Sequence, residues 1–322
     1  MKLTPLVDPH VFENKPSSAT RDGFGEGLLA AAIKDPRVVA LTADLAGSTK
    51  LSDFIKRFPK RFVQVGVAEQ DLAAVASGLA HVGKIPFITS FAVFSPGRNW
   101  EQIRTTICYN DQPVKIVGSH SGLGVGEDGA THQALEDIAI TRCLPNMQVV
   151  VPADAGQASK ATQAIAKTKS PTYLRLSRQK VPQVMASKAP FVIGKAQVLA
   201  QGKDIAIIAC GPMVYEALRA AKLLEEDKIH ATVINCHTIK PIDQATIIAA
   251  AKRTRLVLTV EDHQIGGGLG GAVAELLSQK CPTRIVMMGV RDRFGESGPC
   301  EELFEKHRLT AKWIAKRVRG EV

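Results

Sequence analysis

Aromatic residues are scarce in this sequence, since Phe, Trp and Tyr make up only 5% of its 322 residues. Proteins that bind single-stranded nucleic acid stack the bases on aromatic side chains interleaved with basic ones. No stretch of this chain combines the two, so we expect no nucleic-acid partner. Lys and Arg nevertheless outnumber Asp and Glu by 41 to 31, which gives a net charge of +10. That charge favours small anionic ligands such as phosphorylated metabolites.

Long apolar runs and paired cysteines are also missing. No run approaches the ~20 apolar residues of a membrane span, and residues 1–23 have no apolar core of signal-peptide length. The cysteines, at positions 108, 143, 210, 236, 281 and 300, form no CxxC pair and show no metal-ligand spacing. These absences fit a reducing compartment. We therefore expect a cytoplasmic protein with no membrane contact.

Short apolar runs alternate with helical patterns along the whole chain, and the runs are apolar on nearly every residue, as in a covered parallel sheet. The sequence predicts an α/β fold of two doubly wound domains, a parallel-sheet domain over residues 1–185 and a smaller mixed-sheet domain over residues 186–322. Residues 179–190 contain Pro, Lys and Ser without a regular period and mark the boundary. The predicted helices are 23–33, 52–57, 69–82, 100–109, 135–142, 155–167, 214–225, 244–253 and 269–279, and the strands are 38–43, 62–67, 86–91, 114–117, 147–151, 172–176, 204–210, 230–234, 256–260 and 284–289.

The glycine pattern GxGxxG occurs twice, at residues 124–129 and 266–271. In dinucleotide-binding proteins this pattern follows a strand directly and contacts a pyrophosphate. Glu127 and Asp128 lie inside the first pattern and would repel a pyrophosphate. Five residues separate the second pattern from the strand before it, so we interpret it as a glycine-rich helix entry that lets backbones approach closely.

A long loop, residues 119–133, lies inside the first predicted domain, and loops of this length are usually functional. It contains His120, Glu127, Asp128 and His132, which are residue types that bind metals. No HxH or HxxxH pair fixes two ligands on one regular element, so we expect a substrate loop and no metal site. GSHSG at 118–122 resembles a nucleophile elbow, but its central residue is His120 and not serine, which argues against a hydrolase.

Glu69 stands where the predicted strand 62–67 gives way to the helix 69–82. A solvated carboxylate in the first turn of a helix is favoured by the helix dipole alone. Open α/β sheets also bind their ligands at the carboxyl ends of strands, which is where Glu69 lies. The position leaves a functional role open.

Taken together, an ordered set of segments resembles the C-terminal section of a transketolase, from about residue 19 to the end of the chain. Each segment alone is a weak signal, but the order makes the set specific. The segments are ATR (19–21), ADLAGS (43–48), GVAEQ (66–70), TSFAVF (89–94), GSHSGLGVGEDGATHQALED (118–137), LPNMQVVVPAD (144–154), LRLSRQ (174–179) and RFGESGPCEELFEK (293–306).

The resemblance implies a pyrimidine-binding domain followed by the family's C-terminal domain, with thiamine diphosphate as the cofactor whose ylid supplies carbanion chemistry. Glu69 would meet the aminopyrimidine ring nitrogen and promote the imino tautomer, which takes the proton from the thiazolium carbon. Phe91 and Phe94 match aromatics of the pyrimidine pocket, and Asp44 and Leu45 match positions beside the thiazolium ring. SPG at 95–97 departs from the family, which often carries a tyrosine and one more residue there.

The resemblance also implies how a sugar phosphate would bind. Asp128 and His132 match residues that hydrogen-bond sugar hydroxyls near the reacting carbons, so His132 joins Glu69 and His120 as an expected catalytic residue. Arginine suits phosphate because its planar fork donates two hydrogen bonds. The positions that match the phosphate-binding residues of the family are Arg21, Ser48, His120 and Arg178.

A complete transketolase carries an additional domain with a GDG motif and a later asparagine, which hold magnesium and the diphosphate. No GDG motif occurs in this sequence. We therefore expect an N-terminal partner subunit that holds Mg²⁺ or Ca²⁺, self-association through this chain, and an α2β2 assembly with its active sites between chains.

Three other interpretations stay open from the sequence. The beta subunit of a 2-oxoacid dehydrogenase's decarboxylating component has a similar split design, although it usually carries HSQ where this chain has THQ at 131–133. Deoxyxylulose phosphate synthase shares the two domains, normally within one longer chain. A non-catalytic regulatory half of a thiamine enzyme is disfavoured by the intact Glu69, His120 and His132. Phosphate and hydroxyl contacts do not distinguish pentose, hexose and sulfonated substrates.

Overall fold

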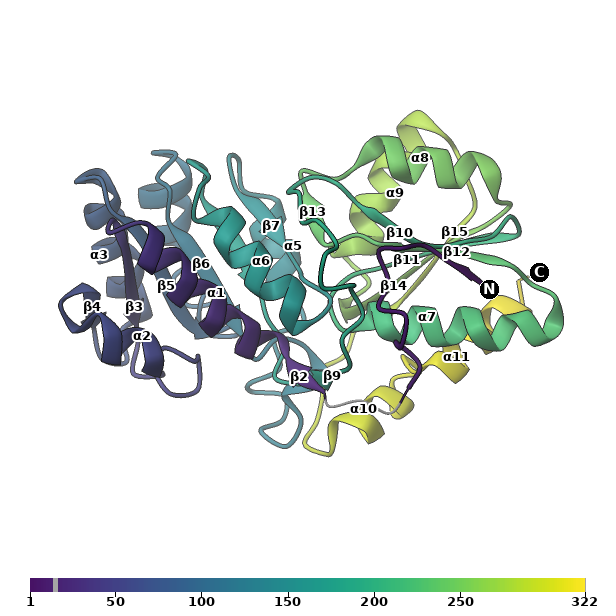
Figure 1. Cartoon of the computed structure of the whole chain (residues 1–322), viewed down its shortest axis with the longest axis horizontal. Helices are drawn as coiled ribbons and strands as arrows, with labels where there is room; N and C mark the ends of the chain where they lie inside the picture. Colours follow the sequence, from purple (N-terminus) through teal and green to yellow (C-terminus); the bar gives the residue numbers. More distant parts are fainter. Residues whose placement is uncertain (14–16, 322) are drawn as a thin grey trace.

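The computed structural model describes residues 1–13 and 17–321 and consists of two α/β lobes, each built on one sheet (Figure 1). The first sheet has seven strands in the order β13-β7-β8-β6-β5-β3-β4. The second has six, in the order β1-β10-β12-β11-β14-β15. The predicted α/β class with two doubly wound sheets is confirmed.

The first sheet is parallel except at one edge, where β13 runs antiparallel to β7. Every residue of β3 and β6 is buried, because helices cover both faces of the sheet. The strands are β3 (Val38–Thr42), β4 (Phe62–Gln64), β5 (Ile85–Phe91), β6 (Lys115–Ser119), β7 (Gln148–Val150), β8 (Thr172–Arg175) and β13 (Thr238–Lys240).

Helices α1 and α6 pack closely against each other on this sheet. A Cβ atom at Gly23 would lie 1.8 Å from the carbonyl oxygen of Ala155, so only glycine permits this approach. Asp154 caps α6 by accepting a hydrogen bond from the backbone N–H of Gln157. The helical segments of this lobe are α1 (Thr20–Lys34), α2 (Ser52–Arg57), η1 (Pro59–Arg61), α3 (Glu69–His81), α4 (Trp100–Gln102), the π-helix η2 (Ile103–Cys108), η3 (Leu123–Val125), α5 (Asp137–Arg142) and α6 (Ala155–Ile165).

The second sheet is mixed, with a parallel part, β12-β11-β14-β15, and two antiparallel strands, β10 and β1. Figure 1 shows α8 and α9 on one face of this sheet and α7 and α11 on the other. The elements are β1 (Lys2–Leu3), β10 (Gln197–Gln201), β11 (Ile205–Ala209), α7 (Met213–Leu224), η4 (Glu225–Asp227), β12 (Ala231–Asn235), α8 (Gln244–Arg253), β14 (Val257–Gln264), α9 (Leu269–Lys280), β15 (Ile285–Val290), α10 (Cys300–Lys306) and α11 (Ala311–Arg319).

Two short strands cross between the halves of the chain. β1, at the N-terminus, extends the second sheet by pairing with β10, and β13, from the second half, extends the first sheet by pairing with β7. A two-stranded ribbon, β2 (Ser18–Ala19) with β9 (Lys180–Val181), joins the start of α1 to the segment after β8. The two lobes are therefore tied together by backbone pairing as well as by side chains.

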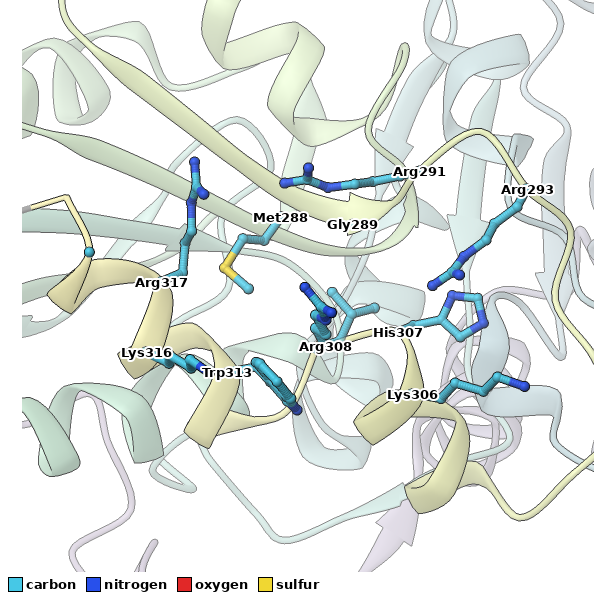
Figure 2. Close-up of a pocket in the computed structure, with 12 residues that line it drawn as sticks. Met288, Gly289, Arg291, Arg293, Lys306, His307, Arg308, Trp313, Lys316 and Arg317 are labelled. Carbon is cyan, nitrogen blue, oxygen red and sulfur yellow. The ribbon is translucent and has the colours of Figure 1, made fainter.

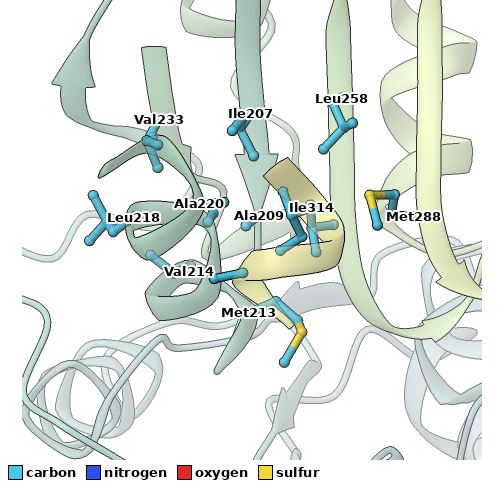
Figure 3. Close-up of a cluster of buried hydrophobic side chains, with 14 of the residues drawn as sticks. Ile207, Ala209, Met213, Val214, Leu218, Ala220, Val233, Leu258, Met288 and Ile314 are labelled. Atoms are coloured by element: carbon cyan, nitrogen blue, oxygen red, sulfur yellow. The ribbon is translucent and has the colours of Figure 1, made fainter. Parts of the chain in front are cut away.

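The C-terminal helices close the second lobe. Together with the end of β15 they border a pocket lined by basic side chains, which Figure 2 shows. Helix α11 buries Ala311, Ile314, Ala315 and Val318, which recur on one face of the helix. Figure 3 shows Ile314 beside side chains of α7 and the central strands in the core of this lobe.

Several elements differ from those that the sequence predicts. The prediction omits the short strands β1, β2, β9, β10 and β13 and the last two helices, α10 and α11. It also ends a strand at residue 260, whereas β14 continues to Gln264. Among the described residues, no helix is both long and apolar enough to cross a bilayer.

Candidate active site

The predicted site residues gather at the carboxyl edge of the first sheet. Phe91 ends β5 and His120 follows β6, while Asp44 follows β3 and Glu69 begins the helix after β4. These strands are neighbours in the order β6-β5-β3-β4, so their carboxyl ends form one continuous edge. This is the edge where open α/β sheets bind ligands.

Glu69 lies in the first turn of α3 with only 3% of its side chain exposed. Its Oε2 accepts a hydrogen bond from Nη1 of Arg98 across 3.2 Å, and its backbone oxygen accepts one from Nδ2 of Asn99 across 2.9 Å. The same amide of Asn99 donates to Oγ of Ser95, in the segment that departs from the family pattern. That segment therefore fixes Glu69, although the family resemblance names neither Arg98 nor Asn99.

Next to Arg98, on the side away from Glu69, the site contains a group of aromatic rings. The rings of Phe91 and Phe94 stack at 5.9 Å with 16° between their planes, and Arg98 lies 4.2 Å from the centre of the Phe94 ring. His120 lies 3.8 Å from the Phe91 ring, and His132 lies 5.4 Å from the Phe94 ring. Arg98 thus connects the buried carboxylate to a platform of four rings.

His120 is buried and makes two hydrogen bonds through its ring. Its Nε2 lies 2.7 Å from Nη1 of Arg21, and its Nδ1 lies 2.9 Å from Oγ of Ser119. Burial, reinforced by the charges of Arg21 and Arg178, lowers the pKa of His120 to about 3. The imidazole is therefore neutral at physiological pH.

Arg21, at the start of α1, is a cation with unused donors. Its Nη1 also donates to the backbone oxygen of Ser48 across 3.3 Å, while its Nε is buried and has no hydrogen-bond partner among the described residues. The neighbouring carboxylate of Asp22 binds Lys50 instead, at 3.0 Å. A buried guanidinium donor without a partner is suited to an incoming anion.

Arg178 comes from the segment after β8 and reaches the loop 119–133. Its Nη1 donates to the backbone oxygen of Val125 across 2.7 Å and lies 3.4 Å from Glu127 and 3.7 Å from Asp128. All three partners belong to the same loop, so this guanidinium holds the loop beside Arg21 and His120. The two carboxylates also compete with any anion for Arg178.

Asp44 and Leu45 lie in the turn after β3. The backbone N–H of Asp44 donates to Oε1 of Gln64, and its Oδ1 accepts from Nε2 of the same side chain. The carbonyl oxygen of Leu45 accepts from the hydroxyl of Thr49. Within residues 1–13 and 17–321, these hydrogen bonds attach the turn to β4 and to its own end, and none joins it to the ring platform.

The second lobe holds the loop 119–133 through a buried acid. Asp262, near the end of β14, accepts hydrogen bonds from the backbone N–H of Leu123 at 2.8 Å and of Gly124 at 3.3 Å. Arg175 donates to the backbone oxygen of Asp262 and forms a buried ion pair with Asp137 at 2.7 Å. A sequence reading that ends the strand at residue 260 misses Asp262.

The second lobe also contacts the loop 119–133 through the segment that precedes α10. Nε2 of Gln133 donates to the backbone oxygen of Glu296 across 3.0 Å. The carboxylate of Glu296 lies 2.6 Å from the ammonium of Lys306 and 3.9 Å from Nε2 of His307. Glu296 therefore contacts the loop with its backbone and α10 with its side chain.

The second glycine pattern, residues 266–271, has an internal partner in place of a nucleotide. The carboxylate of Glu261 accepts from the backbone N–H of Leu269 at 2.6 Å and of Gly270 at 2.8 Å, at the start of α9. A pyrophosphate would need these same donors. In the part of the chain that the structure describes, no group of three or more His, Cys, Asp or Glu could hold a metal ion.

Models of two known protein domains match this chain. The pyrimidine-binding domain of transketolase matches residues 17–183, and the transketolase C-terminal domain matches residues 194–314. The chain belongs to the transketolase family. It corresponds to the C-terminal section of the enzyme, as the resemblance implies.

Three relatives support this assignment. The chain is 45% identical over 305 residues to the transketolase C-terminal section of Methanocaldococcus jannaschii, with 94% of this chain and 96% of that one covered. It is 41% identical to a 6-deoxy-6-sulfo-D-fructose transketolase subunit of Clostridium sp., with 92% of each covered. A solved split-gene transketolase, described as an inactive β4 tetramer, superposes with a TM-score of 0.88 at 47% identity and covers 94% of this chain and 97% of that one.

Membership of the transketolase family implies dependence on thiamine diphosphate. The residues present fit the pyrimidine half of this cofactor, because a buried carboxylate, Glu69, lines a cavity of about 500 Å³ together with Arg98. The stacked rings of Phe91 and Phe94 provide a flat apolar surface next to it. A stacking surface and a carboxyl group together can bind a planar heterocycle through its face and its ring nitrogen.

Proposed function

We propose that this chain is the C-terminal subunit of a two-chain thiamine diphosphate-dependent transketolase that moves a two-carbon ketol unit between sugar phosphates. The observation that carries the proposal is a continuous series of contacts across the carboxyl edge of the first sheet. Glu69 contacts Arg98, Arg98 contacts the Phe94 and Phe91 rings, and His120 connects these rings to Arg21. An acid for the cofactor and a cation for the substrate thus share one surface.

The cofactor, when bound, would supply carbanion chemistry. Glu69 would share a hydrogen bond with the pyrimidine nitrogen of the bound cofactor, and its burial would keep water from competing for that hydrogen bond. Arg98 is half-exposed, at 52% of its side chain, so it can yield its place on Glu69 to the pyrimidine. Asp44 and Leu45 would border the ring that reacts.

The substrate would extend from the cofactor toward the cations. His132 and Asp128 would bind hydroxyl groups near the reacting carbons. Arg21, Ser48 and Arg178 would bind the distal anion, and His120 would serve that site by orienting the guanidinium of Arg21. The buried Nε of Arg21, which has no partner among the described residues, supports an anionic ligand there. The Clostridium relative acts on a sulfonated sugar, so a sulfonate in place of the phosphate fits the same cations.

An N-terminal subunit would complete the site with Mg²⁺ or Ca²⁺ and the diphosphate ligands, in an α2β2 assembly. The relatives of similar length support this division, because they are described as a section, a subunit and a split-gene product. Exposed apolar side chains beside Glu69 also favour a covered surface, since Val67 is 72% and Val75 is 40% exposed. This face would carry the self-association of the chain or the contact with its partner.

The experiment compares the purified chain with the same chain co-expressed with the N-terminal transketolase subunit of its own genome. The assembled protein should transfer a two-carbon unit from a ketose phosphate to an aldose phosphate and bind thiamine diphosphate with Mg²⁺. The chain alone should do neither. Tight magnesium-dependent cofactor binding by the isolated chain in calorimetry, or an assembled complex without transfer activity, would refute the proposal.

A further inference from the structure

A pocket of about 550 Å³ lies in the second lobe, between the end of β15 and the helices α10 and α11. It is built from different elements than the candidate active site, and we call it the basic pocket. Among the residues that the structure describes, no Asp or Glu belongs to its lining. The side chains of its lining include Arg291, Arg293, Lys306, His307, Arg308, Trp313, Lys316 and Arg317 (Figure 2).

Most of the positive charge in the basic pocket has no carboxylate partner. Lys306 is paired with Glu296 and Arg317 with Glu321, both at 2.6 Å. The other four cations, Arg291, Arg293, Arg308 and Lys316, form no ion pair within the described parts of the chain. Four like charges around one cavity repel each other and attract anions.

His307 adds a buried polar group to this cavity. Its side chain is only 2% exposed, and its Nδ1 has no hydrogen-bond partner among the residues that the structure describes. Burial and the charge of Arg293 lower the pKa of His307, so the ring is neutral and can direct one nitrogen to a ligand. Buried polar atoms are nearly always paired, so this nitrogen marks a place for a missing partner.

Trp313 gives the basic pocket a rigid wall. The ammonium of Lys316 lies 4.8 Å from the ring centre, and the guanidinium of Arg308 lies 5.0 Å from it. The indole N–H donates to Glu305, which fixes the ring. These cation–π contacts hold two of the four unpaired charges at the cavity without neutralising them.

We propose that the basic pocket is a binding site for a small anion that carries two phosphate groups. A single phosphate carries about two negative charges, whereas four unpaired cations surround the cavity. Arginine forks, which donate paired hydrogen bonds to phosphate, supply three of those four cations. A sugar bisphosphate and a nucleoside diphosphate share this chemistry, and both are small enough for a cavity of this volume.

The test titrates the full chain with inorganic pyrophosphate, without Mg²⁺, at about 0.15 M salt, where long-range attraction is screened. Trp313 reports binding by its fluorescence once the only other tryptophan is removed by Trp100→Phe. We expect a saturable change in Trp313 fluorescence, at a lower concentration of pyrophosphate than of inorganic phosphate. No saturable binding, or equal affinity for phosphate and pyrophosphate, would overturn the proposal.

A charge-matched pair of double variants locates the site. Arg291→Gln with Arg308→Gln removes two unpaired cations of the basic pocket, and both residues are exposed, so folding should be preserved. Lys252→Gln with Arg253→Gln removes two exposed cations at the end of α8, outside the lining. The first pair should weaken pyrophosphate binding about tenfold or more, and the second should change it less than about twofold. Equal effects would mean non-specific attraction and would overturn the location.

Two further titrations identify the source of the phosphates. Fructose 1,6-bisphosphate and ADP present the same groups on a sugar and on a nucleoside. A tighter binding of either one than of pyrophosphate names the ligand class and supports the site. If both bind more weakly than phosphate alone, the cavity does not accept an organic bisphosphate, and the proposal is overturned.

Discussion

Arg21 donates a hydrogen bond to Nε2 of His120 across 2.7 Å. Arginine has no acceptor, so Nε2 must accept, and the ring proton of the neutral imidazole must sit on Nδ1, where it faces Oγ of Ser119. His120 therefore orients the guanidinium and does not act as a proton donor through Nε2. Its buried ring thus links Ser119 of β6 to Arg21 of α1 by two hydrogen bonds.

NMR of histidine labelled with ¹⁵N in the ring tests this tautomer directly. His120 should appear as the neutral, Nδ1-protonated form at every pH from about 5 to 9, because burial and Arg21 lower its pKa to about 3. His10, which is exposed, provides the comparison within the same spectrum. Titration of His120 near its ordinary pKa, or an Nε2-protonated form, would contradict the prediction.

Glu69→Gln should leave assembly with the partner intact and reduce transfer activity by at least ~100-fold, because an amide cannot share a proton with the pyrimidine. Exchange of the thiazolium proton, followed by NMR in the assembled complex, should slow in parallel. Asp53→Asn removes an exposed carboxylate from the first turn of another helix, α2, and should change activity little. Activity and exchange near the wild-type level in Glu69→Gln would reduce Glu69 to a helix-start residue.

Arg178→Ala should raise the KM for a sugar phosphate by about ten- to a hundredfold with a smaller effect on kcat, because a charge-assisted contact to the phosphate is lost. Hydroxypyruvate has no phosphate and serves as the control donor. Its KM should stay almost unchanged at the same ionic strength. Equal losses for both donors would instead assign Arg178 to holding the loop through Val125, and the phosphate contact would have to be abandoned.

Asp262 predicts an unusual dependence of stability on pH. Burial raises the pKa of Asp262 to about 6, so between pH ~4 and ~6 the folded chain holds a proton that the unfolded chain has released. The contribution of this group to stability is therefore present at low pH and lost as the pH rises through about 6. Asn does not titrate, so the stability difference between Asp262→Asn and wild type should shift in favour of the variant as the pH rises from 4 to 7, by on the order of 2 kcal/mol.

Melting temperatures of both proteins across this pH range give the comparison. The difference between them isolates Asp262 from the buried histidines, which act in the opposite direction because burial lowers their pKa. Asp292→Asn, an exposed acid in the same lobe, should show no such trend. A pH-independent difference for Asp262→Asn would mean that Asp262 stays ionised throughout.

The spacing of apolar residues along the sequence predicts most of the fold. The helices α2 and α8 have the predicted bounds, and the buried strands of both sheets stand where the apolar runs lie. The edge strands β1 and β13 have only two or three residues and carry no period, so their pairing depends on tertiary contacts. Helix α11 did carry a signal, because Ala311, Ile314, Ala315 and Val318 follow a helical spacing.

The sequence predicts those residues of the candidate site that belong to a motif within one segment. It does not predict the residues that act where the two lobes meet. β14 continues through Glu261, Asp262 and His263, three ionisable residues that normally end a buried strand. They are buried because backbone N–H groups from the loop 119–133 and from α9 bind the two carboxylates. These donors come from distant parts of the chain, so no local sequence pattern predicts them.

Glu296 connects the basic pocket to the loop 119–133. Its carboxylate pairs with Lys306, a wall of the basic pocket, and its carbonyl accepts from Gln133 in the loop expected to bind substrate. An anion that draws Lys306 away would loosen the support of that loop. Thermodynamic reciprocity then requires that substrate and anion alter each other's affinity by the same factor.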